Sequence, residues 1–323
     1  MGGRGDGAGV SGHAPADRRV GFVGLGTMGA PMAQHPLEAG WAVVGWNRTP
    51  ERAQAVWDAG AERRPTPRAV AEAVELVVVS QYDDDALLAV VEGPDGVAAG
   101  CRPCSVVVET STVSPAASRS AAAAVAERGG TLLRAPVSGN PVLVRAATVT
   151  FMCSGERAAY ERCLPLFDLL GKAAFHLGEG EEARYAKLAV NLMVAGTMQL
   201  MAETLGLAEA AGLDRRAMLE VLSQSAIGSP FVAYKTDPLV AGDYSPTFSV
   251  DGLRKDLRLV IDVAGDARVP LPVTGLVDQL LAACQGAGWG HLDLAALVLL
   301  EQRLRGADDE LAVPTDARSE LDA

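Results

Sequence analysis

The sequence predicts an α/β fold in which a doubly wound, mostly parallel sheet comes first and an all-helical domain follows. Two observations support this prediction. Between Arg19 and about Gly178, short apolar runs alternate with Ala-rich segments of helical period, which is typical of a parallel sheet covered by helices. After Glu179 the helical period continues without a convincing strand. The chain has 323 residues and is 49% hydrophobic, which is enough to bury two cores.

The first half contains seven candidate strands. Each is a run rich in β-branched or other apolar residues that ends near glycine, proline or a small polar residue. The candidates are Val20–Gly24, Ala42–Trp46, Leu76–Ser80, Ser105–Thr110, Thr131–Arg134, Thr148–Cys153 and Ala173–His176. Between them lie amphipathic segments such as Pro50–Ala59 and Pro115–Arg128, and we expect these to be helices.

The second half begins with a long helix. Apolar residues keep helical spacing from Glu181 to Ala211 without a proline, a length of about eight turns. Its apolar part carries Asn191 and Gln199, so we expect a buried helix and no membrane span. Further helices are expected at Arg215–Ser223, Val250–Ala264, Pro272–Ala287 and Ala295–Leu304. The predicted domains are 19–180 and 181–305, with flexible tails at 1–18 and 306–323.

Charge and cysteine content exclude several classes of function. The net charge is -12, so the protein repels a phosphate backbone and nucleic acid is not an expected partner. Cys101 and Cys104 form one CxxC, but no second pair or His pair stands at ligand spacing, so we expect no metal site. The odd number of cysteines, five, and an N-terminal stretch without an apolar signal segment together predict a cytoplasmic protein.

The most informative stretch is GFVGLGTMGAPMA, from Gly21 to Ala33. A strand precedes its glycines and a helix follows them, which is the context of a dinucleotide-binding turn. In such a Rossmann turn the glycines let the chain turn tightly, approach a pyrophosphate and pack helix against strand. We therefore expect a nicotinamide dinucleotide to contact the residues of this turn. They are Gly24, Gly26, Thr27, Met28 and Gly29.

The end of the second strand predicts which dinucleotide is bound. An NAD enzyme usually has an Asp or Glu there, which binds the ribose hydroxyls. This chain instead has Asn47, Arg48 and Thr49. Arginine can pair with a 2′-phosphate, and the two neighbouring side chains can form hydrogen bonds with it. We therefore expect NADP(H) to be favoured over NAD(H). A solvated arginine at the start of a helix is the alternative interpretation.

Two further motifs are candidates for chemistry. Lys187 and Asn191 are four residues apart in the long helix, so they share a helix face. Burial and a nearby nicotinamide cation would lower the pKa of Lys187, which would make it a proton donor and acceptor; a lysine that extends to the surface is the alternative. Ser138 and Gly139 follow a strand and lie between prolines. Their hydroxyl and backbone N–H groups suit a carboxylate, although a simple turn has the same composition.

Taken together, these residues resemble the β-hydroxyacid dehydrogenase family, which includes 3-hydroxyisobutyrate dehydrogenases and glyoxylate/succinic semialdehyde reductases. The resemblance covers about Arg19 to Arg305 and rests on motifs that occur in the family order. They are GFVGLGTMGAPMA, TSTVSP at Thr110–Pro115, APVSG at Ala135–Gly139, KLAVN at Lys187–Asn191 and FSVDGLRKDLRLV at Phe248–Val260. Within the family, the reductase branch is more similar to this chain at Val190.

The resemblance implies a function and a set of roles. It implies hydride transfer between NAD(P)H and a small carboxylated aldehyde, or the reverse reaction from the β-hydroxyacid. Lys187 is then the general acid and base, and Asn191 positions the substrate. Ser138 and Gly139 hold the substrate carboxylate, Thr112 contacts the nicotinamide end of the cofactor, and Lys255 is a second cofactor contact. The resemblance also implies a homodimer or homotetramer formed by the helical domain.

The chain departs from the family pattern at several positions. Arg134 replaces an aspartate and Asn140 replaces a glycine, and the loop Pro141–Ala147 lacks the usual glycines. Because this loop borders the substrate in the family, we expect the departures to affect which side group the substrate carries. Gln81 and Tyr82 replace a common Leu-Pro pair.

Two other functions remain open. Imine reductases are similar in fold and share the glycine and Asn-Arg-Thr motifs, but they generally lack the lysine that aligns with Lys187. A catalytically silent, cofactor-bound scaffold is the other alternative, and such a protein would have little need for Lys187 and Asn191 on one helix face.

Overall fold

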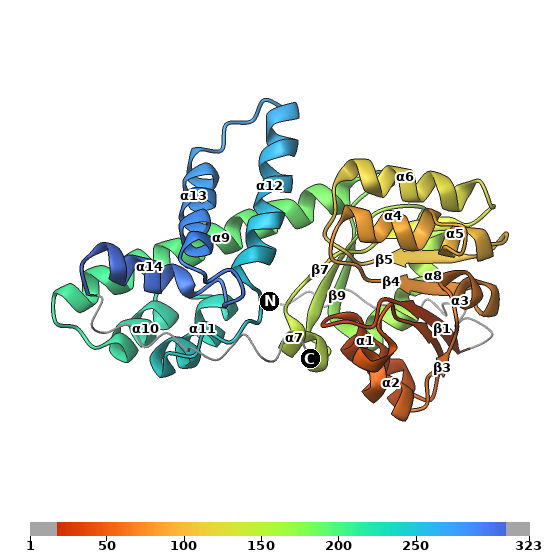
Figure 1. Ribbon diagram of the computed structural model, residues 1–323, viewed down its shortest axis with the longest axis horizontal. Coiled ribbons are helices and arrows are strands. Elements are labelled where there is room, and N and C mark those ends of the chain that lie inside the picture. Colours follow the sequence, from red (N-terminus) through yellow and green to blue (C-terminus); the bar gives the residue numbers. More distant parts are fainter. Residues whose placement is uncertain (1–17, 308–323) are drawn as a thin grey trace, which may run out of the picture. The chain divides into compact units, whose positions relative to one another are not determined.

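The structure is a computed structural model that describes residues 18–307 (Figure 1). The chain consists of two compact units, with the division between Lys187 and Leu188. The first unit contains both sheets, and the second is built of helices. Apart from residues 18, 306 and 307, the tails expected at 1–18 and 306–323 lie outside the described residues.

A six-stranded parallel sheet forms the centre of the first unit. Its strands are β1 (Arg19–Val23), β2 (Ala42–Trp46), β3 (Glu62–Arg63), β4 (Leu76–Val79), β5 (Val106–Glu109) and β6 (Thr131–Arg134). Their order is β3-β2-β1-β4-β5-β6, so the chain winds outwards in both directions from β1. In such a sheet the strand order reverses between β1 and β4, and ligands bind there at the carboxyl ends of the strands. The doubly wound prediction is confirmed.

Helices cover both faces of this sheet. They are α1 (Gly29–Glu38), a 3₁₀ helix at Pro50–Ala53, α2 (Gln54–Asp58), α3 (Pro67–Ala73), α4 (Asp84–Glu92), α5 (Val97–Gly100), α6 (Pro115–Ala126), α7 (Pro141–Arg145) and α8 (Arg157–Leu170). Side chains alternate along the strands: Val78 belongs to the core shared with α1, α2 and α8, whereas Val77 and Val79 belong to the core shared with α3 to α6. Figure 1 shows α4 and α6 on one side of the sheet and α1 and α2 on the other.

A second, smaller sheet accounts for one error in the sequence prediction. Its strands are β7 (Val137–Ser138), β8 (Val149–Cys153) and β9 (Gly171–His176), in the order β7-β8-β9. We expected the last two candidate strands to extend the doubly wound sheet. Instead the chain turns after β6 at Pro136, and β7 pairs antiparallel with β8. An apolar run predicts a buried strand but not its partner, so the sequence could not separate the two sheets.

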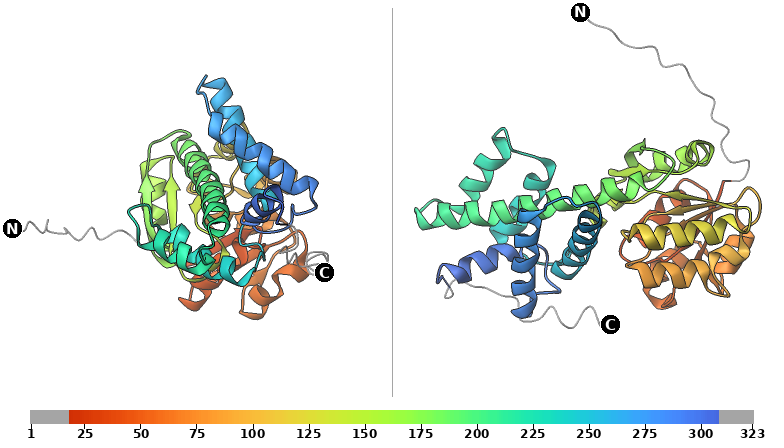
Figure 2. Two further views of the ribbon diagram at one scale, coloured as in Figure 1. Left: turned by 90° about the vertical axis from the view of Figure 1, so that its left-hand side faces the viewer. Right: turned by 90° about the horizontal axis from the view of Figure 1, so that it is seen from above.

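The second unit contains most of α9 (Glu182–Ala210), which begins in the first unit and is a single helix in Figure 2. Five more helices follow: α10 (Arg215–Gln224), α11 (Pro230–Ala241), α12 (Val250–Asp266), α13 (Pro272–Gly286) and α14 (Ala296–Leu304). Met198 and Leu205 of α9 share a core with residues of the other helices, Leu253 and Leu281 among them. The sequence analysis missed α11 because prolines stand at its first position and in its interior; a proline at the first position of a helix is tolerated.

Among the described residues, α9 is the one helix that is long and apolar enough to cross a membrane by length and composition. This is weak evidence, because the core helix of a soluble protein passes the same test. The inward residues of α9 belong to the core of the second unit. On its outer side Met193, Leu200 and Leu207 are exposed at intervals of seven residues. The helix was predicted to be buried, and this is correct for one side of α9 only.

A buried ion pair lies inside the helical unit. The Lys235 ammonium donates to Asp293 Oδ1 over 2.5 Å and to Thr247 Oγ1 over 3.2 Å. The other oxygen of Asp293 accepts the Thr247 N–H over 3.0 Å. Both charged side chains are 3% exposed, so each charge depends on the other for compensation.

Replacing this lysine tests how much the helical unit depends on the pair. Lys235→Met leaves the Asp293 carboxylate buried without its counter-charge, and we expect the free energy of unfolding to fall by about 3–5 kcal/mol. Arg216→Met is the matched control, since it breaks an exposed pair with Asp237 that contributes about 0–1 kcal/mol. Urea unfolding followed by circular dichroism measures both. An equal loss of unfolding free energy in the two variants would show that the Lys235–Asp293 pair matters no more to stability than an exposed pair.

Candidate functional site

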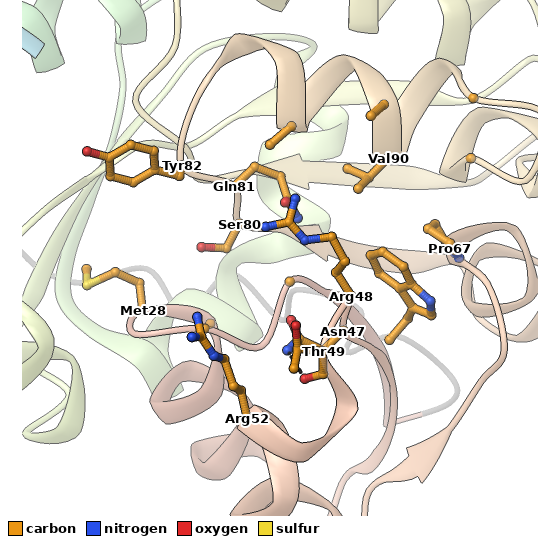
Figure 3. A pocket seen from close by; sticks show the side chains of 18 of the residues that line it. Met28, Asn47, Arg48, Thr49, Arg52, Pro67, Ser80, Gln81, Tyr82 and Val90 are labelled. Carbon is orange, nitrogen blue, oxygen red and sulfur yellow. Dashed lines mark hydrogen bonds between the residues drawn. The ribbon is translucent and has the colours of Figure 1, made fainter. Parts of the chain in front are cut away.

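A cavity of about 580 Å³ lies in the first unit at the carboxyl ends of β1, β2 and β4. It lies where the strand order reverses. It is lined by the glycine turn after β1, the end of β2 with the 3₁₀ helix, the start of α3, and the chain that runs from the end of β4 through α4 to residues 93–96. In Figure 3, Met28 and Tyr82 lie towards one end of the cavity and Pro67 and Val90 towards the other. A long cavity of this kind suits an extended ligand with two chemically different ends.

The glycine turn has three glycines with different physical roles. Gly24 has φ +96°, and a Cβ there would lie 2.1 Å from the Ser80 carbonyl oxygen. A Cβ on Gly29 would lie 1.9 Å from the Gly24 carbonyl oxygen, whereas one on Gly26 would meet no heavy atom of the described residues within 4 Å. The fold therefore requires Gly24 and Gly29. Gly26 instead leaves open space on the lining of the cavity, next to the start of α1, where a helix N-terminus attracts anions.

The three polar side chains predicted at the end of β2 lie close together (Figure 3). Asn47 Oδ1 accepts the Leu25 N–H over 3.0 Å, and Asn47 Nδ2 donates to the Thr49 carbonyl over 2.7 Å, so Asn47 ties the glycine turn to β2. Arg48 and Thr49 line the cavity, as do Gly24, Gly26, Thr27, Met28 and Gly29. Every predicted residue of the turn and of the β2 end is thus part of one cavity.

Arg52 also lines this cavity, and the sequence analysis did not identify it. It lies in the 3₁₀ helix that follows Thr49, and its spacing of four residues from Arg48 was the available signal. Two guanidinium groups at the end of β2 make this part of the cavity locally cationic in a protein of net charge -12. The site, and not the overall field, must therefore attract an anion.

The unusual pair after β4 supports the glycine turn. Gln81 Nε2 donates to the Val23 carbonyl over 3.0 Å, and its backbone N–H donates to Ser111 Oγ over 2.8 Å. The Tyr82 side chain is 58% exposed and lines the cavity. Gln81 is therefore a structural link between the turns that follow β1 and β5, and Tyr82 is the member of the pair that is placed to meet a ligand.

The residues expected to bind a carboxylate, and Thr112, the expected contact of the nicotinamide end of the cofactor, lie elsewhere in the first unit. Ser138 ends β7 and is half-buried. Gly139 has φ +152°, and a Cβ there would lie 2.7 Å from Val149 Cγ1, so glycine is required. Thr112 follows β5 and is half-buried. None of these three residues lines the 580 Å³ cavity.

Two departures from the family pattern have structural explanations. Arg134 Nε donates to Ser118 Oγ over 3.0 Å, and its guanidinium pairs with the Glu181 carboxylate. Asn140 Oδ1 accepts the Leu143 N–H over 3.0 Å and caps α7. Both side chains are therefore engaged in contacts within the protein. The expected effect of these departures on the substrate's side group stays a prediction.

The predicted catalytic lysine is buried. Lys187 is 9% exposed and Asn191, one turn further along α9, is 2% exposed. In the second unit Asn191 Nδ2 donates to Asp256 Oδ2 over 2.5 Å, and the Lys255 ammonium lies 2.8 Å from Asp256 Oδ1. Asp256, which the sequence analysis gave no role, therefore joins two predicted site residues. Its position beside Lys255 in the last motif was the available signal.

The described residues offer no alternative metal chemistry. Within residues 18–307 no group of three or more His, Cys, Asp or Glu side chains could hold a metal ion. The five cysteines lie in this range and are free thiols. Burial raises the pKa of Cys101 to about 11, so this thiol stays protonated at neutral pH and is a poor nucleophile.

Family models match most of the chain. The NAD binding domain of 6-phosphogluconate dehydrogenase matches residues 19–178. The NAD-binding domain of NADP-dependent 3-hydroxyisobutyrate dehydrogenase matches residues 181–300. The two matches meet near the start of α9 and together cover both units.

Two kinds of curated relative are similar to the chain. A cytokine-like nuclear factor N-PAC from Gallus gallus is 32% identical over 283 residues, which are 88% of this chain and 51% of the relative. The chain thus spans about half the length of the first curated relatives it matches. The chloroplastic glyoxylate/succinic semialdehyde reductase 2 from Arabidopsis thaliana is 30% identical over 279 residues, 86% of this chain and 78% of the enzyme.

Solved structures agree with this result. A 3-hydroxyisobutyrate dehydrogenase from Salmonella typhimurium has a TM-score of 0.80 and 30% identity, and the match covers 87% of this chain and 99% of that one. An imine reductase from Pseudomonas sp. has a TM-score of 0.61 and 26% identity, and the match covers 88% and 99% of the two chains.

The contrast between Gly26 and Gly29 tests whether the turn holds a dinucleotide. A Cβ in Gly26→Ala meets no heavy atom of residues 18–307 within 4 Å, so we expect an unchanged melting temperature. NADPH binding should weaken about tenfold or more, because the methyl group occupies space that a pyrophosphate needs. Gly29→Ala forces a carbon against a backbone oxygen and should destabilise the protein by about 1–3 kcal/mol. Calorimetry measures both quantities. Unaltered NADPH binding in Gly26→Ala would contradict the assignment.

Proposed function

Because the chain belongs to the β-hydroxyacid dehydrogenase family, we propose that it is an NADPH-preferring reductase that interconverts a small carboxylated aldehyde and its β-hydroxyacid. The observation that carries this proposal is Lys187, a lysine that is 9% exposed within an apolar stretch of α9, one helical turn before Asn191. Burying a lysine is costly because its charged form loses hydration, and Asn191 places a second polar group on the same face of the helix.

The cavity of the first unit fits the cofactor. Gly26 leaves room for a pyrophosphate beside the N-terminus of α1, and the β2 end carries Arg48 and Arg52 in place of a carboxylate. These guanidinium groups would pair with a 2′-phosphate, while Asn47 keeps the glycine turn in place. When bound, the cofactor supplies the hydride for the reduction.

The protein's own residues would hold the substrate and move the proton. Ser138 and Gly139 offer a hydroxyl and backbone N–H groups to the carboxylate. Asn191 orients the carbonyl group. Lys187 donates a proton to the oxygen that becomes the alkoxide, and it takes the proton back in the oxidative direction. Burial keeps the lysine dry, which strengthens its interaction with a developing negative charge.

Two alternatives have some support from the comparisons. Imine reductases are among the similar solved structures, and this function would need a different proton donor from Lys187. The N-PAC relatives carry the name of a nuclear factor and not of an enzyme, which keeps a silent, cofactor-bound scaffold in consideration. The presence of both Lys187 and Asn191 on α9 favours the reductase over either alternative.

Two expectations stay predictions. One is the homodimer or homotetramer, for which the exposed Met193, Leu200 and Leu207 of α9 offer an apolar surface. The other is the cytoplasmic location, since one relative is named as chloroplastic and another as a nuclear factor.

Substitution at the β2 end tests the cofactor preference. Arg48→Asp removes a cation and places a carboxylate beside the 2′-phosphate, so we expect the Kd for NADPH to rise about tenfold or more, from the loss of a charge-assisted bond. The Kd for NADH should change by less than about threefold, because NADH has no 2′-phosphate. Arg63→Asp is the control, as Arg63 is exposed on β3. An equal loss for both cofactors would show that Arg48 does not contact the 2′-phosphate.

Removing the lysine tests the chemistry. Lys187→Met keeps an apolar side chain of similar length but has no proton to donate, so we expect kcat with succinic semialdehyde to fall about 100-fold or more. NADPH binding should be retained, since the lysine does not line the cavity. Lys172→Met, at an exposed position, controls for loss of a lysine charge. Normal turnover by Lys187→Met would refute the role of this residue.

A further inference from the structure

The start of α9, just before Lys187, carries a pair of opposite charges that is almost completely buried. The Arg184 side chain is 1% exposed and that of Glu109 is 0% exposed, and the Arg184 guanidinium contacts Glu109 Oε2. Glu109 is the last residue of β5, at the carboxyl end of the sheet. The ion pair therefore joins the first turn of α9 to the edge of the sheet where ligands bind in this fold.

The same pair encloses the turn that follows β5. Arg184 also donates to the Ser111 carbonyl over 2.5 Å, and Glu109 Oε1 accepts the Ser111 N–H over 2.6 Å. Ser111 Oγ accepts the Gln81 N–H, and Gln81 Nε2 donates to Val23, next to the glycine turn. A continuous set of hydrogen bonds thus runs from α9 to the cavity.

Two other side chains hold the chain where it enters α9, from Gly180 to Ala183. The Glu181 carboxylate pairs with Arg134 of β6. Ser154 Oγ donates to the Gly180 carbonyl over 2.8 Å and accepts the Ala183 N–H over 3.2 Å. A helix start frays where the N–H groups of its first turn lack partners outside the helix. The start of α9 is held instead by side chains from β6 and from the residue after β8.

Stability alone does not explain a buried pair of this kind. Desolvation of both charges is so costly that apolar replacements of similar volume are often neutral or stabilising. Burial lowers the pKa of Arg184 to about 9, and Asp84 acts in the opposite direction, so the side chain stays charged at neutral pH. What an ion pair with several hydrogen bonds provides beyond apolar contacts is a defined geometry.

Arg184 lies three residues before Lys187, and residues at this spacing are neighbours on a helix surface. The orientation of the first turn therefore fixes the direction in which the lysine leaves α9. We propose that Arg184 and Glu109 are positioning residues that hold Lys187 in register with the turn after β5. This inference rests on the proposed function, because it assigns the pair a task in placing the proton donor.

Fixing the helix matters because proton transfer is sensitive to distance. A donor must come within hydrogen-bond reach of the reacting oxygen, and a misplacement of about 1 Å can cost about 100-fold in rate. An α9 start that was merely packed would keep the fold but allow the lysine several positions. The ion pair removes that freedom.

The decisive variant replaces both charges together. Glu109→Leu with Arg184→Met leaves no unpaired buried charge, so the protein should still fold. Its melting temperature should be somewhat lower than that of the wild type, because the Ser111 N–H and carbonyl lose these two partners. We expect its kcat with succinic semialdehyde to fall about tenfold or more, while the KM for the aldehyde and the Kd for NADPH change by less than about threefold. Arg184→Lys alone keeps a positive charge opposite Glu109 but loses the fork of guanidinium donors, so its kcat should lie between those of the wild type and the double variant. Arg157→Met breaks an exposed pair on α8 and is the control.

A second measurement does not depend on activity. The chain has four lysines, Lys172, Lys187, Lys235 and Lys255, so reductive methylation can be followed at each by peptide mass spectrometry. In the wild type Lys187 should react slowly, since it is 9% exposed, and Lys172 is an exposed internal reference. In the double variant the rate of Lys187 relative to Lys172 should rise about fivefold or more, because the helix start opens more often.

The outcomes separate the two proposals. A folded double variant with normal kcat would overturn the positioning role, and so would a lower kcat with unchanged methylation of Lys187. A wild type that reduces no carboxylated aldehyde would refute the proposed function. In that case methylation decides alone: faster reaction of Lys187 would support the positioning role, and an unchanged rate would overturn it.

Discussion

The close approach between Gly29 and the Gly24 carbonyl fixes the position of α1 relative to β1, and the cavity is built around this turn. Gly29 packs so near the Gly24 carbonyl that a Cβ would come within 1.9 Å of the oxygen. This contact places the N-terminus of α1 against the end of β1, beside the point where strand order reverses. The cavity, the two arginines after β2 and the hydrogen bonds through Gln81 are all arranged around that fixed turn. A helix end held this close to the sheet presents its positive pole to an anion.

Local charge, and not net charge, governs both the cavity and the start of α9. The chain is acidic overall, with a net charge of -12, yet Arg48 and Arg52 make the part of the cavity beside the end of β2 cationic. Elsewhere the protein buries charges in pairs: Glu109 with Arg184 in the first unit and Lys235 with Asp293 in the second. Such pairs add little net stability compared with apolar contacts, but each defines one geometry.

Much of the fold could be predicted because its signals are local. The seven predicted strands, the long helix and the glycine turn follow from apolar periods and from glycine geometry, and the strand limits at β1, β2, β4, β5 and β6 agree with the structure to within one residue at each end. The two-residue strands β3 and β7 were not predicted, because so short a strand has no period of its own. The separation of β7–β9 into a second sheet depends on which strands pair, and periodicity carries no information about pairing. The contacts of Arg134 and Asp256 join segments far apart in the chain. Their residue types were visible in the sequence, but their partners were not.

The most direct test of the account compares two classes of substrate with one enzyme preparation. NADPH consumption by the purified protein is measured with glyoxylate, succinic semialdehyde, methylmalonate semialdehyde and tartronate semialdehyde, and with one cyclic imine. The account predicts turnover of at least one carboxylated aldehyde and little turnover of the imine, because a lysine proton donor serves an alkoxide. Turnover of the imine alone, or of nothing despite tight NADPH binding, would contradict it.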